Sequence, residues 1–347
     1  MIIDINMHHL PGNLFTDKKI LDGFLSCVPD EAGQNACVIT MDSGKQQLIL
    51  EKPKGYQNLN YVEGDYDLES KLKAMDENGV DAAILRVPVW QEWLKLDTCK
   101  LINDEAADLC QRSKGRLFGT ACVPPWGGKD NIYEVERCVK ELGFVGVQLA
   151  CHYGDVYLDD EKFKPYLKVL NDMEIPVVVH HTPLPVRYES IIDWTNLRRE
   201  MGRIMDQMTA VGRELFSGMF DEFPNLKFIH TMFGGNWFAN YKLMAPKKGK
   251  KKEAMDRLNM DESERVQRYL QNNIFFDTTH PASWGKDQVE CAIKVCGADH
   301  ILFGTSFPVF YNWMSDGVEF MKTLDISRSE RKQIMSENAI KMFNLKV

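Results

Sequence analysis

Histidines gather at the ends of the segments that have the pattern of β-strands. Seven of the eight histidines end or closely follow such a segment, and only His300 begins one. In residues 2–11 apolar and polar side chains alternate, so Asn6 and His8 project from the same face of the predicted strand before Pro11 ends it. Imidazoles placed in this way can bind a metal ion or transfer protons. The sequence therefore predicts a polar site where several strands end.

Further polar side chains follow the other predicted strands. A single histidine at a strand end is more often a hydrogen-bonded structural residue than a ligand, so the pair His8 and His180 is the strongest candidate. The other candidates at strand ends are Arg86, His152, His230, Asp277, His280 and Ser306. Scattered core histidines would not concentrate in this way, and we expect these residues to surround one site.

The chain alternates between short apolar segments and segments of helical periodicity. After the opening strand, the predicted strands are residues 80–85, 116–123, 144–150, 175–180, 225–232, 273–278 and 300–305. The predicted helices are residues 68–78, 101–113, 132–142, 161–172, 288–296, 317–324 and 329–343, together with a long helical region over residues 191–222 and a helix that Gly234-Gly235 opens. Strands that are apolar on both faces belong in a parallel sheet covered by helices. Eight strand–helix units predict an α/β fold, a single (β/α)8 TIM-like barrel that spans residues 1–347.

One insertion interrupts the alternation after the first strand. Residues 36–40 and 47–50 have the pattern of a β-hairpin, and we expect residues 36–62 to pack over one end of the barrel. The sequence leaves open whether this insertion is a lid over the pocket or a contact between subunits.

Composition excludes several classes of protein. The chain is 44% hydrophobic with a net charge of −8, which disfavours nucleic-acid and membrane-surface binding. The lysine-rich residues 247–252 are expected to form a solvated loop. Nine scattered cysteines without a C-x-x-C pair are typical of a reduced, cytoplasmic protein. There is no signal-peptide pattern and no apolar run long enough to span a membrane.

Four longer motifs carry a resemblance to a known family. They are IPVVVH at residues 175–180, FPNLKFIHTMFGG at 223–235, GADHILFGTSFP at 297–308 and ENAIKMF at 337–343. Together they resemble the amidohydrolase superfamily, within it the branch of aminocarboxymuconate-semialdehyde decarboxylase and related aromatic-acid decarboxylases. The resemblance covers most of the chain and implies a homodimer and a small carboxylated substrate.

The resemblance also implies a metal site, from which this sequence departs. In the family an H-x-H on strand 1, a histidine ending strand 5 and an aspartate ending strand 8 hold a divalent metal, usually zinc. Here His8 and His180 keep two of these places, whereas Asn6 and Ser306 occupy the others. The histidine that acts near the scissile bond, two residues before the Gly-Gly pair, is replaced by Met232, although His230 lies two residues earlier on the same face of the predicted strand. Two imidazoles hold zinc weakly, so we expect either no metal or a weakly held one on His8 and His180.

Three functions remain open at this point. The first is a non-oxidative decarboxylase, in which His8, His180 and His230 do acid–base work and Arg86 or Arg187 binds a carboxylate through a bidentate pair. The residues expected to contact substrate are Asn6, Arg86, His152, Arg187, Met232, Asp277, His280 and Ser306. The second is a metal-independent ester or lactone hydrolase. The third is a non-catalytic member that binds a ligand or an active partner.

Overall fold

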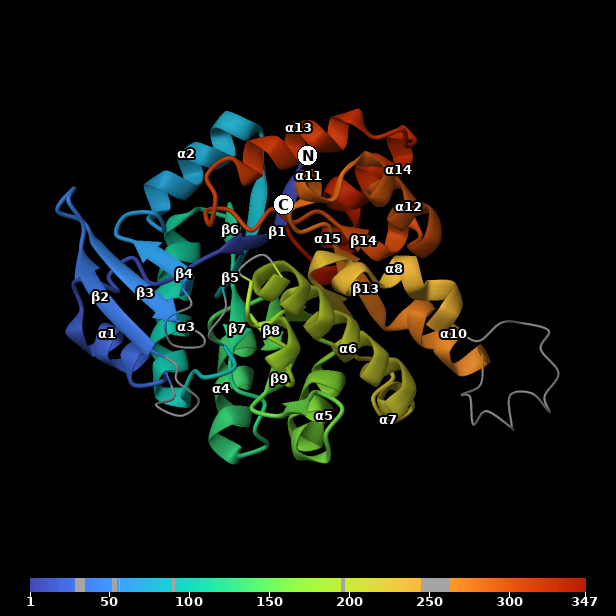
Figure 1. The fold of residues 1–347 in the computed structure, drawn as a ribbon, viewed down its shortest axis with the longest axis horizontal. Coiled ribbons are helices and arrows are strands. Elements are labelled where there is room, and N and C mark those ends of the chain that lie inside the picture. The colour runs from blue at the N-terminus through green and yellow to red at the C-terminus, as the bar shows by residue number, and fades with distance from the viewer. Residues whose placement is uncertain (29–34, 52–54, 56, 89–90, 195–196, 245–262) are drawn as a thin grey trace.

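The computed structural model describes residues 1–28, 35–51, 55, 57–88, 91–194, 197–244 and 263–347. Short parallel strands at the centre are surrounded by helices, and a small separate sheet projects at one edge (Figure 1). The lysine-rich residues 247–252 lie outside the described residues. No helix in the described part of the chain is both long and apolar enough to cross a bilayer.

Nine short segments make up the central barrel. They are β1 (Ile3–His8), β5 (Ala82–Arg86), β6 (Leu117–Phe118), β7 (Thr120–Cys122), β8 (Gly146–Ala150), β11 (Val177–His180), β12 (Phe228–His230), β13 (Ile274–Asp277) and β14 (Ile301–Leu302). The segments β6 and β7 are one strand interrupted at Gly119, where a Cβ atom would come within 2.3 Å of the Phe144 ring. They occupy the eight predicted strands, with shorter bounds.

Parallel pairing joins these strands in chain order into a closed ring. β1 pairs with β5, β5 with β6, and β7 through β8, β11, β12 and β13 to β14. The ring closes because Ile5 N–H donates to the Phe303 carbonyl at 2.9 Å and Ser306 N–H donates to the Asn6 carbonyl at 2.8 Å. The predicted (β/α)8 barrel is confirmed.

The barrel interior and the layer around it have separate cores. Alternate strand residues, among them Ile5, Val178 and Ile229, pack together inside the barrel, where Phe343 and Leu345 from the chain end join them. The opposite faces of the same strands, such as Val177 and Val179, pack against the surrounding helices. The direction of each strand residue therefore decides whether it reaches the interior or the helix layer.

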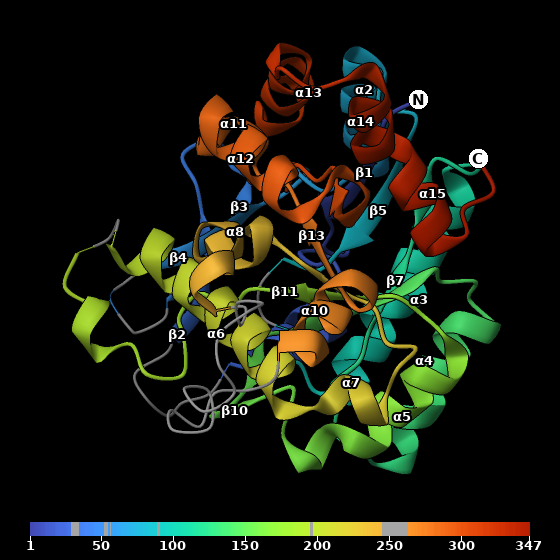
Figure 2. The ribbon, with the colours of Figure 1, turned by 90° about the vertical axis from the view of Figure 1, so that its right-hand side faces the viewer.

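Helices cover the barrel on all sides (Figures 1 and 2). The α-helices are α1 (Lys18–Leu25), α2 (Leu68–Asn78), α3 (Leu96–Arg112), α4 (Lys129–Lys140), α5 (Lys164–Met173), α6 (Gly202–Ser217), α7 (Met219–Glu222), α8 (Met232–Met244), α10 (Ser263–Asn272), α11 (Pro281–Trp284), α12 (Lys286–Cys296), α13 (Trp313–Thr323), α14 (Arg328–Lys332) and α15 (Asn338–Phe343). Single turns of other helix types are η2 (Glu161–Phe163), η3 (Glu189–Ile191), η4 (Leu197–Met201), η5 (Ala298–His300) and η6 (Gln333–Glu337). The predicted long helical region over residues 191–222 consists of the separate pieces η3, η4, α6 and α7.

The segment after β12 differs from the predicted helix start at Gly234-Gly235. The first residues of α8 have left-handed backbone angles, with φ of 56° at Met232 and 68° at Gly235. A Cβ atom on Gly235 would lie 2.1 Å from the Ile204 carbonyl oxygen, so only glycine allows α8 to approach α6 this closely.

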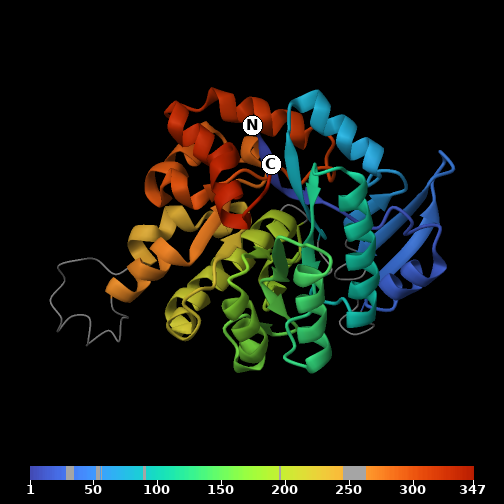
Figure 3. The ribbon, with the colours of Figure 1, turned by 180° about the vertical axis from the view of Figure 1, so that it is seen from behind.

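The insertion is a three-stranded antiparallel sheet of β2 (Asn35–Thr40), β3 (Gln46–Glu51) and β4 (Gln57–Val62) (Figure 3). The predicted hairpin of residues 36–40 and 47–50 is its first two strands, and β4 was missed. Leu48, Leu50 and Tyr61 pack with α1, α3 and the segment after β5. Tyr61 Oη donates to the Pro88 carbonyl at 3.2 Å, so the sheet holds the segment that follows Arg86. Elsewhere β9 (His152–Tyr153) and β10 (Val156–Tyr157) form a short hairpin after β8.

Candidate active site

The end of β1 brings two polar residues into the barrel interior. A register shift between Asp4 and Met7 interrupts the pairing with β5, and Asn6 N–H turns to donate to Asp4 Oδ1 at 2.9 Å. Asn6 is fully buried, and its Nδ2 donates to Thr279 Oγ1 at 2.6 Å and to Asp277 Oδ2 at 3.2 Å. The Asn6 Oδ1 atom has no hydrogen-bond partner among the described residues.

The imidazoles of His8 and His180 face each other across the barrel, with ring centroids 5.4 Å apart. Three strands lie between β1 and β11 on either side of the ring, so the two imidazoles come from opposite walls. Nδ1 of His180 donates to the His181 carbonyl at 2.8 Å, which leaves the lone pair of Nε2 open. Within the described structure, His180 Nε2 and both nitrogens of His8 lack a hydrogen-bond partner.

Burial and positive charge keep these histidines neutral. Loss of solvation lowers the pKa of His8 well below its ordinary value and lowers the pKa of His180 to about 3. The positive charges of Arg86 and Arg203 lower both pKa values further. At neutral pH the two rings therefore offer neutral donors and acceptors to a ligand.

Arg86 places a guanidinium beside the histidine pair. It lies opposite His8 in the β1–β5 register, and its Nε donates to the Ile5 carbonyl at 2.6 Å. The side chain is 1% exposed, yet neither Nη1 nor Nη2 has a hydrogen-bond partner in the described part of the chain. Burial lowers the pKa of Arg86 to about 9, and the charges of Asp277 and Asp4 oppose that shift, so the group stays positive at neutral pH.

Asp277 and Ser306 complete the inner wall. Asp277 accepts hydrogen bonds from Asn6 Nδ2, from Met232 N–H at 3.1 Å and from Thr279 N–H at 3.0 Å. Burial raises the pKa of Asp277, whereas the Thr279 side chain, the Arg86 charge and the N–H groups of Thr279 and Met232 lower it. Ser306 has a φ of 62°, and its buried Oγ atom has no partner among described residues.

His230 points away from the barrel interior, although an acid–base role was predicted for it. By strand alternation it faces the helix layer, where Nδ1 lies 2.8 Å from Gln207 Oε1 and Nε2 lies 2.7 Å from Glu214 Oε2, both on α6. Met232 does not extend the same strand face, because the strand ends at His230 and Met232 turns into the left-handed segment. The interpretation that His230 substitutes for a histidine at Met232 is therefore not supported by its position.

Three other predicted residues differ in their relation to the His8–His180 pair, and of these His280 lies near enough that its charge lowers the pKa of His8. His152 is held by the Gly154 carbonyl at 2.8 Å and Thr182 Oγ1 at 2.8 Å, an arrangement that fixes the hairpin after β8. His280 stacks on Trp313 with centroids 3.8 Å apart, and burial lowers its pKa to about 3. Arg187 is exposed.

One residue near the site was missed from sequence. Arg203, in the first turn of α6, is 7% exposed, and its Nε has no partner among the described residues. Its positive charge contributes to the lowered pKa values of His8, His180 and His280. A basic residue in a predicted helix has no distinctive pattern, so only the structure reveals this position.

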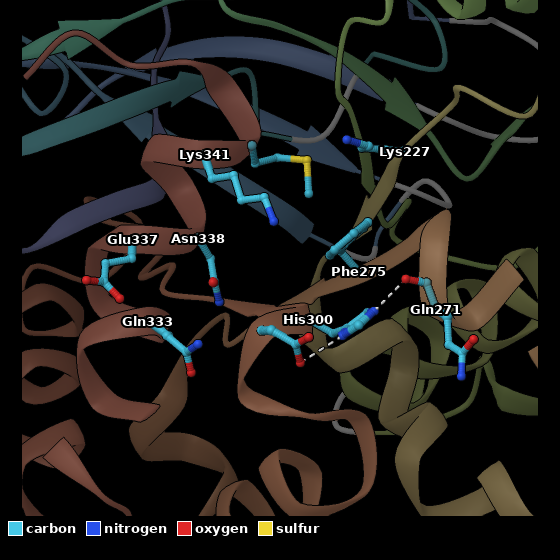
Figure 4. A pocket seen from close by; sticks show the side chains of 10 residues that line it. Lys227, Gln271, Phe275, His300, Gln333, Glu337, Asn338 and Lys341 are labelled. Carbon is cyan, nitrogen blue, oxygen red and sulfur yellow. Dashed lines mark hydrogen bonds and ion pairs between the residues drawn. The ribbon is translucent and has the colours of Figure 1, made fainter. Parts of the chain in front are cut away.

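A pocket at the opposite end of the barrel provides a contrast (Figure 4). It contains His300, whose ring stacks on Phe275 with centroids 5.0 Å apart. Both ring nitrogens are occupied, Nδ1 by Asp299 Oδ1 and Nε2 by the Gln271 carbonyl, each at 3.0 Å. The pocket therefore leaves no open imidazole nitrogen for chemistry, as expected for the amino-terminal face of a barrel.

The site does not have the donors of a metal centre. No group of three or more His, Cys, Asp or Glu side chains in the described structure is arranged to hold a metal ion. Besides the two histidines, the corresponding side chains are the amide of Asn6 and the hydroxyl of Ser306, which are poor zinc ligands. Arg86 adds a positive charge beside them. The residues present do not fit a divalent metal.

Comparison with known proteins establishes the family. Residues 91–345 match the model of the amidohydrolase family. The chain belongs to the amidohydrolase family. This confirms the resemblance predicted from the four motifs, and the chain is a member of an enzyme family.

Relatives of this amidohydrolase include several decarboxylases. It is 27% identical over 301 residues to gamma-resorcylate decarboxylase of Polaromonas sp., covering 80% of this chain and 87% of the relative. It is 20% identical over 287 residues to 2-amino-3-carboxymuconate-6-semialdehyde decarboxylase of Dictyostelium discoideum, covering 81% and 77%. The fold matches 5-carboxyvanillate decarboxylase of Novosphingobium aromaticivorans, complexed with manganese and 4-hydroxy-3-methoxy-5-nitrobenzoic acid, with a TM-score of 0.73, 22% identity and coverage of 99% and 96%.

Proposed function

We propose that this amidohydrolase is a non-oxidative decarboxylase of a small cyclic or aromatic carboxylic acid. The observation that carries the proposal is the group of open, buried polar atoms on Arg86, His8 and His180 inside the barrel mouth. Such atoms are costly to bury without partners, so they are suited to bind a polar ligand. The relatives that are named decarboxylases of small carboxylic acids support this choice of ligand.

In this proposal each group has a distinct role. The Nη1 and Nη2 atoms of Arg86 bind the substrate carboxylate as a bidentate pair, since Nε already anchors the guanidinium to the Ile5 carbonyl. His8 and His180 hydrogen-bond the ring substituents and deliver a proton. Asp277 holds Asn6 and is a positioning residue rather than a proton donor, because it accepts three hydrogen bonds.

The reaction adds one proton and releases CO2. A proton goes to the ring carbon that bears the carboxylate, the bond from that carbon to the carboxylate breaks, and its electron pair restores the ring. Burial and the nearby arginines lower the pKa values of His8 and His180 in the free protein. A bound carboxylate favours the protonated imidazole, so the proton donor is formed when the substrate binds.

The hydrolase alternative has less support from the structure. Hydrolysis without a metal requires a nucleophile activated by a base. Ser306 Oγ has no hydrogen-bond partner in the described part of the chain, so no base activates it. The non-catalytic alternative predicts the same ligand binding but no release of CO2, so a turnover measurement separates the two.

The homodimer stays a prediction, which sedimentation would test.

Incubation with hydroxylated benzoic acids, followed by measurement of released CO2, tests the proposal. We expect CO2 release by the wild-type protein and at least about a hundredfold slower release by His8→Gln, as for loss of an acid–base group. His300→Gln, at the opposite end of the barrel, is the matched control and keeps full activity. Absence of CO2 across a panel of mono- and dihydroxybenzoates would contradict the proposal.

A further inference from the structure

We propose that the site binds a carboxylate without any divalent metal, because the guanidinium of Arg86 supplies the positive charge there. This inference deepens the proposed function and rests on it only for the class of ligand, an aromatic carboxylate. It concerns what holds that ligand, whatever the rate of turnover.

Most side-chain atoms near the histidine pair are either engaged in hydrogen bonds or are weak zinc ligands. Asn6 Nδ2 is committed to Thr279 and Asp277, and its free Oδ1 is a neutral amide oxygen. Ser306 offers a hydroxyl, and Asp277 spends its oxygens on three hydrogen bonds. Among the described residues, the two imidazoles are the strong zinc ligands that face the space between β1 and β11, and two fall short of the three that a catalytic zinc site normally has.

The guanidinium of Arg86 is held in a fixed orientation. Its Nε is tied to the Ile5 carbonyl at the base of the site, which orients the planar guanidinium. The remaining atoms, Nη1 and Nη2, are buried and have no hydrogen-bond partner among the described residues. Two parallel N–H donors in this position match the two oxygens of a carboxylate.

The unpartnered atoms of the two buried arginines favour an anion. Arg86 and Arg203 place two positive groups near His8 and His180. The carboxylates of Asp277 and Asp4 act on Arg86, and that of Glu200 acts on Arg203. The atoms of these arginines that lack a partner among the described residues are N–H donors, which attract an anion and repel a cation.

Metal analysis and calorimetry of the full-length protein test the inference. Protein purified without chelator is expected to contain less than about 0.1 divalent metal per chain, on the ligand-count argument. It is expected to bind 2-hydroxybenzoate with the same Kd in EDTA and in Mn²⁺. The neutral analogue 2-hydroxybenzamide, which has the same shape, is expected to bind at least about tenfold more weakly.

Substitution of the guanidinium identifies the residue responsible. Arg86→Lys keeps the charge but loses the planar fork, and we expect it to bind 2-hydroxybenzoate at least about tenfold more weakly. Arg213→Lys, the same change at an exposed Arg213–Asp159 ion pair outside the barrel, is the control and keeps the wild-type Kd. If Arg86→Lys does not fold, the comparison of the acid with the amide on wild-type protein still decides.

Specific outcomes overturn the inference. About one equivalent of tightly held metal, binding that disappears in EDTA and returns with Mn²⁺, or equal affinity for the acid and the amide would each contradict it. Binding of 2-hydroxybenzoate without metal and without CO2 release would support the inference while contradicting the proposed function, so the two failures are distinguishable.

Discussion

Histidines in the barrel interior and in the layer between β12 and α6 differ in whether their ring nitrogens have hydrogen-bond partners. In the interior, His8 and His180 lie 5.4 Å apart and keep three ring nitrogens without partners in the described structure. In the outer layer, both nitrogens of His230 are occupied by Gln207 and Glu214. All three residues end strands, so position at a strand end does not distinguish them. The direction in which the side chain points distinguishes them. Side chains that point into the barrel are available for chemistry, and those that point toward the helices stabilise the fold.

The largest effect is expected from His180→Ala. The substitution removes an open imidazole from the site, so kcat/KM for CO2 release should fall about 10²- to 10⁴-fold. The free energy of unfolding should change little beyond the loss of packing. Steady-state kinetics together with urea denaturation would check both expectations, and an activity within tenfold of wild type would remove His180 from the proposed chemistry.

His230→Ala is expected to show the reverse behaviour. It leaves Glu214 buried without its partner at 2.7 Å, which costs about 3 kcal/mol of unfolding free energy or more. Activity per folded molecule should remain close to wild type. Glu214→Gln, which removes the charge and keeps the volume, serves as the matched control and should be less destabilising. A hundredfold loss of activity in folded His230→Ala would place this residue in the chemistry after all.

The interior histidines should also make stability depend on pH. Because the pKa of folded His180 is lowered to about 3, the unfolded chain, with a histidine pKa of about 6.5, binds one more proton between these values. Stability therefore rises with pH across this window and is lost as pH falls below about 6.5. His180→Ala should reduce the slope by about 1.4 kcal/mol per pH unit near pH 5. Equal slopes for the two proteins would show that His180 is not neutral and buried.

The smallest effect is expected at the exposed arginine. Arg187→Ala should change kcat/KM by less than about twofold, because surface substitutions away from a site have small effects and Arg187 is exposed. Arg86→Ala, measured in parallel, should lower kcat/KM far more. If Arg187→Ala raised KM tenfold, the carboxylate would be bound nearer the surface than proposed.

The sequence predicts the barrel well because its signals are local. Apolar segments bounded by glycine and proline mark the strands, and α2 ends at Gly79 with a φ of 65°, as its sequence indicates. The direction in which a side chain points at a strand end is harder to predict. The register shift in β1 turns Asn6 and His8 inward, and the early end of β12 separates His230 from Met232; both depend on pairing between distant segments.

The charges of the site were predicted only in part. Arg86 ends a predicted strand, and its position follows from that pattern. Arg203 comes from a helical region whose breaks into η3, η4 and α6 are not visible in the periodicity. The β4 strand of the insertion was also missed, although its Tyr61 holds the segment after Arg86.

A crystal structure of the protein with 2-hydroxybenzoate, grown without added metal, would test the central claim most directly. The account predicts the ligand between His8 and His180, with both carboxylate oxygens within hydrogen-bond distance of Arg86 Nη1 and Nη2. A metal ion coordinated by His8 and His180, or a carboxylate bound away from Arg86, would contradict it.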